Sequence, residues 1–378
     1  MAVPAKLDLI AIRRDLHQHP ETAFNEHRTA RVIADHLRSL GLQPRFVATT
    51  GVVAEIEGAE SGPLVALRAD TDALPIQEQS GVGFASRYPG VMHACGHDMH
   101  VAILLGAAEI LSQSRRELRG RVRLIFQPAE ETTEGARALV EAGVIDGVEA
   151  IFGLHNHPGL PAGKVAFREG SLMAASDRLR IKVLGKGGHA AQPHLTIDPV
   201  VAAAGILTGM QTLVSRVVDP LEPLVVSIGH LTAGSTFNVI PDTALMEGTV
   251  RYFNPELRRV LPRQLKGLVS GIAEGYRCSA EVEYQHMVPP VHNDTRLNEL
   301  ALGCAIDLLG EENTLPAERS LGAEDFAVYQ ECVPGCFFWL GSGGPYGWHH
   351  PAFTVDESAI EVGARLLAAM AREATRIL

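Results

Sequence analysis

The stretch from Met92 to His100, MHACGHDMH, holds a thiol, three imidazoles and a carboxylate just before an apolar helical pattern. All of these side chains can bind metal, and thiolate beside neutral imidazole suits zinc or another borderline divalent ion better than calcium or magnesium. A single histidine near a helix start is more often a cap or a half-buried polar group. Cys95 and His97, two residues apart and followed by Asp98, instead favour part of a metal site.

Two adjacent carboxylates, Glu130 and Glu131, follow an apolar run further along the chain. Adjacent loop residues point in different directions, so one carboxylate can ligate a metal while its neighbour faces the substrate as a general base. Two solvated acids at the N-terminus of the next helix, where the helix dipole favours negative charge, are the alternative. The pair alone leaves both interpretations open.

Together, residues from several separated loops supply enough ligands for two ions that share a water molecule. The set is Cys95, His97, Glu131, His155 and one of His349 and His350. A pair of divalent ions activates water and polarises a carbonyl group. A structural zinc site would use four closely spaced ligands. The scatter of these residues along the chain therefore favours catalysis.

The elements that must position these residues alternate between strand and helix, which predicts a mostly parallel sheet with helices on both faces. The expected strands are Val52–Ile56, Leu64–Leu67, Arg121–Phe126, Glu149–Gly153 and Gly335–Leu340. The expected helices are two within residues 5–40, then Val101–Leu111, Ala136–Ala142, Thr295–Leu309, Glu324–Glu331 and a final helix to Leu378. Ligands of such sheets gather outside the carboxyl ends of the strands. Asp70, Asp72, Glu130, Glu131 and His155 follow strand ends, which predicts one shared site.

A different pattern occupies residues 178–289. Its order is strand Leu179–Leu184, helix Ile197–Val217, strands Leu224–Leu231 and Thr243–Phe253, helix Pro255–Gly275 and strand Ser279–His286. This β-α-β-β-α-β order is that of the ferredoxin-like α+β arrangement. We therefore predict an inserted domain at 178–289 and a discontinuous α/β domain formed by 1–177 and 290–378.

Composition narrows the class of partner and compartment. The 378 residues include 44 acidic and 33 basic side chains, a formal charge of -11, which speaks against nucleic acid and anionic membranes as partners. Five scattered cysteines do not indicate a disulfide framework, and Met1–Leu16 lacks a long apolar segment. We expect a cytoplasmic protein, and we interpret the uncharged run Pro199–Ser215 as a packed helix rather than a membrane span.

The chain also resembles a known family, the aminoacylase, hippurate hydrolase and auxin-conjugate amidohydrolase branch of the dinuclear metallopeptidases. The matching stretches run in family order over nearly the whole chain: RRDLHQHPE at 13–21, RADTDALP at 68–75, HACGHDMH at 93–100, QPAEE at 127–131, GLHNHP at 153–158, GKGGHAAQPH at 185–194, FNVIPDTA at 237–244, GTVR at 248–251, GAEDF at 322–326 and HHPAF at 349–353.

The resemblance implies a catalytic domain with two divalent ions per subunit, zinc or manganese, with cobalt and nickel as alternatives. It also implies that the inserted domain is a lid, which often mediates dimerisation, so a homodimer or a dimer-based oligomer is expected. By matching position the metal ligands would be Cys95, His97, Glu131, His155 and His349. Glu130 would be the general base. His349 fits the family pattern of His, any residue, Pro, and His350 remains the alternative.

Further roles follow from the same resemblance. His189, which follows Gly187 and Gly188 in the lid, would help to stabilise the oxyanion, frequently that of the partner subunit. Asn238 would be an assisting hydrogen-bond donor. Arg251 would clamp a substrate carboxylate, with a salt bridge at a sheet edge as the alternative. Asp72 would orient a metal ligand, whereas Asp70 occupies a position where other branches have a histidine ligand.

The expected activity is metal-dependent hydrolysis of an N-acyl amino acid, with an acetyl, benzoyl or similar acyl group, to a carboxylic acid and a free amino acid. A dipeptidase of the same chemistry is the near alternative. A non-catalytic metal-binding or ligand-binding homologue is the alternative from another class, and the presence of Glu130 argues against it. A zinc deaminase is disfavoured because its H-x-E and P-C-x-x-C signatures are absent.

Overall fold

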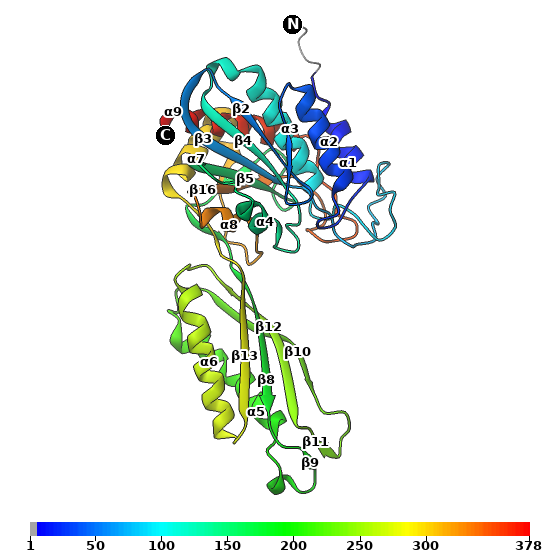
Figure 1. The fold of residues 1–378 in the computed structure, drawn as a ribbon, viewed down its shortest axis with the longest axis vertical. Coiled ribbons are helices and arrows are strands. Elements are labelled where there is room, and N and C mark those ends of the chain that lie inside the picture. The colour runs from blue at the N-terminus through cyan, green and yellow to red at the C-terminus, as the bar shows by residue number, and fades with distance from the viewer. Residues whose placement is uncertain (1–5) are drawn as a thin grey trace. The chain divides into compact units, whose positions relative to one another are not determined.

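A computed structural model describes residues 6–378, which divide into two compact units (Figure 1). The first unit comprises the chain up to Leu172, His292–Glu318 and Glu324–Leu378, and the second comprises Met173–Val291 and Arg319–Ala323. The short segment 319–323 belongs to the second unit because the backbone N–H of Ala174 donates to the carbonyl groups of Ser320 and Gly322. The predicted lack of a signal peptide in Met1–Leu16 concerns in part residues 1–5, which lie outside the described residues.

An eight-stranded sheet forms the first unit, in the order β1-β2-β4-β3-β5-β16-β6-β15. The strands are β1 (Arg45–Val47), β2 (Gly51–Glu57), β3 (Glu60–Asp70), β4 (Arg119–Gln127), β5 (Ala150–His157), β6 (Val165–Phe167), β15 (Thr314–Pro316) and β16 (Gly335–Gly341). The central strands β4, β3, β5 and β16 are parallel, whereas β1 and β2 run antiparallel at one side. The predicted mostly parallel sheet is confirmed.

Helices cover both faces of this sheet (Figure 1). They are α1 (Leu9–Gln18), α2 (His27–Ser39), α3 (His97–Gln113), α4 (Gly135–Glu141), α7 (Thr295–Leu309), α8 (Phe326–Gln330) and α9 (Ala359–Ile377). Helices α3 and α9 pack against each other and on β3, and α4 packs on α8 and β4. Helix α3 is apolar nearly all round, which is typical of a helix inside a core.

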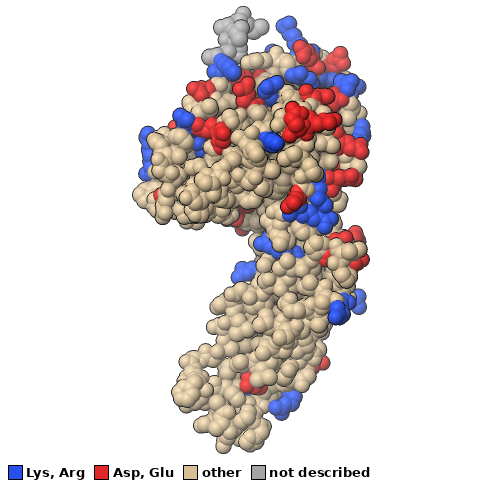
Figure 2. All heavy atoms as spheres, turned by 180° about the vertical axis from the view of Figure 1, so that it is seen from behind, with Lys and Arg blue, Asp and Glu red and all other residues tan. Residues whose placement is uncertain are grey.

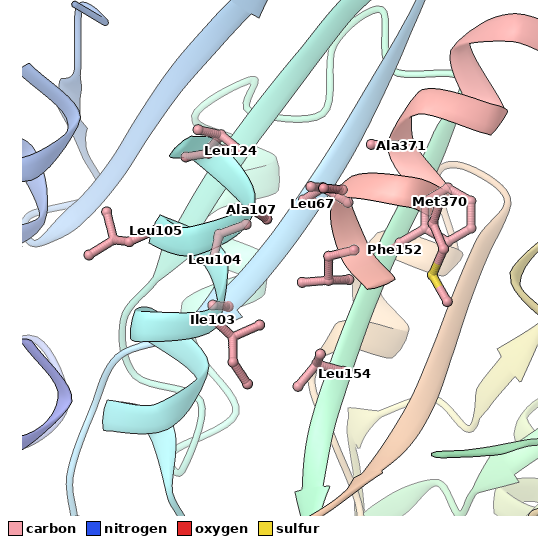
Figure 3. Close-up of a cluster of buried hydrophobic side chains, with 14 of the residues drawn as sticks. Leu67, Ile103, Leu104, Leu105, Ala107, Leu124, Phe152, Leu154, Met370 and Ala371 are labelled. Atoms are coloured by element: carbon pink, nitrogen blue, oxygen red, sulfur yellow. The ribbon is translucent and has the colours of Figure 1, made fainter. Parts of the chain in front are cut away.

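The core lies between the sheet and the helices α3 and α9 (Figure 3). Leu67, Leu124 and Phe152 project from β3, β4 and β5, and Leu104 of α3 and Met370 of α9 meet them from the helical layer. All five side chains are fully buried. Burial of this apolar surface fixes α3, and therefore its first residue His97, against the carboxyl ends of the strands.

Strand β5 is longer than the apolar pattern predicts. The expected strand ends at Gly153, whereas β5 continues to His157. The reason is its parallel neighbour β16, whose Trp339 and Gly341 pair with His155 and His157. His155 is therefore held within the sheet ladder rather than in a loop after it.

The second unit holds a four-stranded antiparallel sheet in the order β10-β12-β8-β13. Its elements are β8 (Ser176–Leu184), α5 (Pro199–Gly209), β10 (Leu224–Ala233), β12 (Thr243–Tyr252), α6 (Leu257–Gly275) and β13 (Ser279–Val288). Buried and exposed residues alternate along β8, as expected for a sheet with one covered face. Helices α5 and α6 pack on that sheet and form its core with the strands.

Short elements complete the described chain. They are the paired strands β7 (Gly170–Met173) and β14 (Val291–Asn293), the paired strands β9 (Gly188–His189) and β11 (Val239–Ile240), and the 3-10 turns η1 (Arg115–Glu117), η2 (Pro193–Leu195) and η4 (Glu311–Asn313).

One predicted helix is wrong in its extent. Instead of one helix over residues 197–217, α5 spans 11 residues and is followed by a π-helical turn, η3 (Leu213–Val217). Gly209, at the end of α5, weakens the helix there. Within the described residues, Pro199–Val217 is the one segment whose length and apolar composition would suit a membrane-spanning helix. In its most apolar stretch, 28% of the residues are buried.

Candidate metal centre

The predicted site residues of the first unit meet at the carboxyl ends of β3, β4 and β5. These strands are parallel, and Asp70 at the end of β3 pairs with Gln127 at the end of β4. The segments that follow, with Asp72 and Glu131, therefore emerge at the same edge as His155 of β5. Helix α3 begins with His97, whose ring lies against Asp72 at that edge.

The five predicted metal ligands form one continuous cluster. The ligand atoms of Cys95, His97 and His155 lie within 4.8 Å of one another, and so do those of Cys95, Glu131 and His349. Cys95 Sγ is 3.3 Å from His155 Nε2, and Glu131 Oε1 is 3.9 Å from His97 Nε2 and 3.4 Å from His349 Nε2. The structure thus brings together residues from four separated parts of the chain.

The hydrogen bonds of two imidazoles fit metal binding. His97 Nδ1 lies 2.8 Å from the carbonyl oxygen of Asp72, and His155 Nδ1 lies 2.8 Å from that of Asn156. A carbonyl oxygen only accepts, so each Nδ1 carries a proton, and in the neutral form of each ring the lone pair is on Nε2. Among the described residues, the fully buried His97 Nε2 has no hydrogen-bond partner. A thiol, imidazoles and a carboxylate around such an atom suit a divalent transition metal.

Asp72 contacts both His97 and the loop that carries Glu130 and Glu131. Its Oδ1 accepts a hydrogen bond from the backbone N–H of Glu130 and its Oδ2 accepts one from that of Glu131, both at 3.0 Å. Oδ1 also lies 3.3 Å from His97 Nδ1. One buried carboxylate therefore contacts an imidazole and the loop that carries both glutamates.

The loops at the site contain residues in the left-handed backbone region. Ala129 and Thr133 flank the two glutamates with φ of 54° and 60°, and His349 has φ of 63°. Such values are uncommon for residues other than glycine and persist only where the surroundings enforce them. The backbone N–H of His349 donates to Ala94 O at 2.8 Å, which ties this strained residue to the segment that carries Cys95.

Buried carboxylates dominate the electrostatics around Glu130. Burial raises the pKa of Glu130 well above its usual value, and the negative charges of Glu324 and Asp325 raise it further. Burial likewise raises the pKa of the Cys95 thiol well above its usual value, together with the charges of Glu131 and Glu130. A cation in the cluster would be the counter-charge that favours the ionised form of both groups.

The pKa values of the two ligand imidazoles, His97 and His155, are shifted in opposite directions. Burial lowers the pKa of His97, but Asp70, Asp72 and Glu131 outweigh it and raise the pKa to about 10. Burial lowers the pKa of His155 well below its usual value. His155 is therefore neutral and able to ligate at neutral pH.

A fully buried arginine, Arg68, neutralises the carboxylates behind the cluster. Its Nη1 donates to Asp70 Oδ2 at 2.7 Å, and its Nη2 donates to Glu324 Oε1 at 2.9 Å and Asp325 Oδ1 at 2.8 Å. Its Nε donates to Gln127 Oε1 at 2.9 Å. Glu324 and Asp325 thereby link the C-terminal part of the chain to β3 and β4.

The two neighbouring histidines near the C-terminus differ in position. His349 reaches Glu131, as described above, although its side chain is 53% exposed. The ring of His350 instead stacks on that of Tyr346, with 4.2 Å between centroids, and its Nδ1 accepts from the backbone of Ala352. The geometry therefore supports His349 as the member of the cluster.

Residues 66–373 match the family model described as Peptidase family M20/M25/M40. The chain belongs to this peptidase family. It is similar to a Bacillus subtilis (strain 168) N-acetylcysteine deacetylase, at 50% identity over 366 residues that cover 96% of each chain. It is also similar to an Arabidopsis thaliana IAA-amino acid hydrolase ILR1-like 4, at 41% identity over 96% of this chain and 84% of the relative.

Solved structures include a similar member of the M20 family. The YXEP protein of Bacillus subtilis, described as a dinuclear metal binding peptidase of that family, superposes with a TM-score of 0.89. It shares 46% sequence identity and covers 98% of both chains. The resemblance to the aminoacylase and auxin-conjugate amidohydrolase branch is confirmed. This chain is thus a metal-dependent hydrolase that acts on amides.

Three predicted residues of this M20 protein lie in the second unit. His189 in β9 pairs with Val239 of β11, and the carbonyl group of Asn238 accepts from the backbone N–H of Ala190 at 3.1 Å, so His189 and Asn238 share one exposed ribbon. Arg251 is half-buried in β12, and burial lowers its pKa. Their predicted roles toward an oxyanion and a substrate carboxylate stay predictions.

Sequence reasoning left several contributors of this M20 site unassigned, namely Arg68, Gln127, Asn156, Glu324 and Asp325. Arg68 offered a signal, because an arginine at the end of the apolar run Leu64–Leu67 must find carboxylates when the strand is buried. The partners themselves carry no local signal, since Glu324 lies 256 positions further along the chain.

Both tryptophans of the chain line one side of the centre. The ring centroid of Trp348 lies 5.2 Å from that of His155 and 5.1 Å from that of His157. Trp339 lies 5.3 Å from His157 and 5.7 Å from Trp348. These aromatic rings form an apolar wall beside His155.

Replacing Arg68 with methionine should destabilise the first unit by about 3–5 kcal/mol, because the change leaves Asp70, Glu324 and Asp325 buried without their cation. Urea unfolding of metal-free protein would measure this loss. The control is Arg121→Met, which removes an exposed ion pair with Glu55 and should cost about 0–1 kcal/mol. Equal losses in the two variants would contradict the role assigned to Arg68.

Proposed function

We propose that this protein hydrolyses N-acyl amino acids to a carboxylic acid and a free amino acid, with two divalent ions as cofactors. The observation that carries the proposal is the convergence of a base, Glu130, with five potential ligands at one edge of the sheet. A carboxylate oxygen of Glu130 lies within 4.8 Å of ligand atoms of His97 and Glu131. The names of the relatives, an N-acetylcysteine deacetylase and an IAA-amino acid hydrolase, support this class of substrate.

The residues proposed to hold the ions are Cys95, His97, Glu131, His155 and His349. Cys95 is common to two triads of ligand atoms, one with His97 and His155 and the other with Glu131 and His349, and these triads would hold the ions. Bound divalent ions polarise a carbonyl group and make water acidic enough to ionise near neutral pH. The thiolate and imidazoles favour Zn²⁺, and Mn²⁺ is the second candidate, with Co²⁺ and Ni²⁺ compatible with the same donors.

Glu130 is proposed to move the proton during hydrolysis. It accepts a proton from the water whose oxygen adds to the amide carbon. It then donates that proton to the amide nitrogen as the carbon–nitrogen bond breaks, so one carboxylate acts as base and then as acid. Asp72 assists by fixing the backbone of Glu130, which limits the positions that the carboxylate can adopt.

The second unit is proposed to act as a lid and to bind a second copy of the chain. β10 lies at the edge of its sheet, where backbone groups are free to pair with another strand. Apolar side chains near that edge are exposed, among them Leu231 in β10 and Phe237 in the loop that follows, the latter 97% exposed. On the face drawn in Figure 2, charged side chains are sparse over this unit. These features support an isologous dimer.

A hydrolysis screen tests the proposed activity. Acetyl, benzoyl and indole-acetyl amino acids should be hydrolysed, and removal of metal with a chelator should abolish turnover because water activation is lost. Zn²⁺ or Mn²⁺ should restore it. The release of free amino acid is the measurement. Activity that survives thorough metal removal would contradict the proposal, and hydrolysis of dipeptides alone would assign a dipeptidase instead.

Replacing Glu130 with glutamine should lower kcat by about 10²–10⁴-fold, because an amide cannot accept the proton from water. Metal content of the purified variant, measured by elemental analysis, should stay that of the wild type. The matched control is Glu134→Gln, an exposed glutamate after the same loop, which should keep full activity. Wild-type turnover in Glu130→Gln would refute the assigned base.

Replacing Phe237 with aspartate should weaken self-association, because it places a charge on an exposed apolar surface near the edge strand. Sedimentation velocity should show a species of twice the chain mass for the wild type and a shift toward the monomer for the variant. The control Phe46→Asp alters an exposed phenylalanine of the first unit and should leave the dimer intact. A wild-type monomer would contradict the proposed assembly.

A further inference from the structure

Asn156 lies at the centre of the hydrogen bonds that connect the ligand-bearing segments. It follows His155 in β5 and is completely buried. Its Nδ2 donates to the carbonyl oxygen of Cys95 at 2.5 Å. Its Oδ1 accepts from Ser342 Oγ at 3.2 Å and lies 3.3 Å from Trp348 Nε1. One carboxamide thus contacts the segment of Cys95 and the loop that leads to His349.

The backbone of Asn156 extends the same connections. Its carbonyl oxygen accepts from His155 Nδ1 at 2.8 Å and from Trp348 Nε1 at 3.1 Å. Its N–H donates to His100 Nε2 at 2.9 Å. Because His100 Nδ1 lies 2.6 Å from Asp70 Oδ1, these bonds also define the tautomer of His100, with the proton on Nδ1.

The chemistry of these contacts requires an amide. Nδ2 faces two acceptors, the carbonyl oxygen of Cys95 and Nε2 of His100, whereas Oδ1 faces two donors. A carboxylate would oppose oxygen to oxygen at Cys95, and an apolar side chain would leave buried groups unpaired. The close approach also restricts its neighbour, because a Cβ on Gly96, which has φ of 88°, would lie 2.5 Å from Nδ2.

We infer that Asn156 is the positioning residue that fixes Cys95, His155 and the His349 loop relative to one another. The inference rests on the proposed function, since those residues are its metal ligands. Cys95 and His155 approach to 3.3 Å, and each is hydrogen-bonded to Asn156 on the side away from its ligand atom. Asn156 acts through these residues and is not itself one of the proposed ligands, so its loss should weaken metal binding first.

The test compares metal affinity in Asn156→Ala and Asn293→Ala, both in the full chain. Asn293 is the matched control, because it is also buried in the first unit and its amide donates to the carbonyl groups of Arg168 and Phe337. Competition of Zn²⁺ with a chromophoric chelator, without substrate, gives the apparent Kd. Asn156→Ala should weaken binding by about 10–100-fold, and Asn293→Ala should leave the Kd unchanged.

A milder variant covers the case in which Asn156→Ala fails to fold. Ser342→Ala removes one donor to Oδ1 and leaves the amide in place, and it should raise the Kd roughly two- to tenfold, the effect expected of one neutral hydrogen bond. The absorption spectrum of the Co²⁺-loaded protein reports the geometry around the ion. It should therefore change more in Asn156→Ala than in Ser342→Ala.

The outcomes separate the two proposals. Equal Zn²⁺ affinity in the wild type, Asn156→Ala and Ser342→Ala would overturn the positioning role and leave the proposed hydrolase intact. A wild type that binds Zn²⁺ and loses affinity in Asn156→Ala, yet hydrolyses no amide, would support the positioning role and overturn the proposed function. A wild type that binds no divalent ion would overturn both.

Discussion

Buried negative charge is the constraint on which the site depends. Asp70, Asp72, Glu130, Glu324 and Asp325 are all buried at one edge of the sheet. Arg68 forms ion pairs with three of them, Asp70, Glu324 and Asp325. Glu130 has no such partner in Arg68, and burial and its acidic neighbours raise its pKa well above the usual value. Carboxylates removed from water require cations or protons. Arg68 supplies one such cation, and metal ions held by the ligand cluster would supply the others.

The order of the parallel strands explains why acidic residues and ligands from distant segments lie close together. Parallel strands place their carboxyl ends together, so β3, β4 and β5 deliver Asp72, Glu131 and His155 to one edge. The loop before α9 adds His349, and α8 begins next to Asp325. The first unit is discontinuous in sequence, and its site draws on both parts. Metal binding and folding of this unit are therefore coupled.

Much of this arrangement could be predicted from sequence because its signals are local. Apolar runs that end in polar residues locate β3 and β4, and the apolar segment after HACGHDMH predicts a helix from Val101, although α3 already begins at His97. Three-residue strands such as β6 and β15 have no periodicity to detect, and the break after Gly209 is hidden within an apolar run. The partners of Arg68 and Asn156 depend on contacts between distant segments, which no local pattern encodes.

The two tryptophans have a consequence for observing this protein in solution. Trp339 and Trp348 are its only tryptophans, and both lie against His155 or His157. Indole emission is sensitive to nearby imidazoles and to bound ions, whereas the second unit contributes no indole at all. Tryptophan fluorescence, excited selectively, therefore reports on one small region of a chain of 378 residues, and the protein carries its own optical probe of that region without any label.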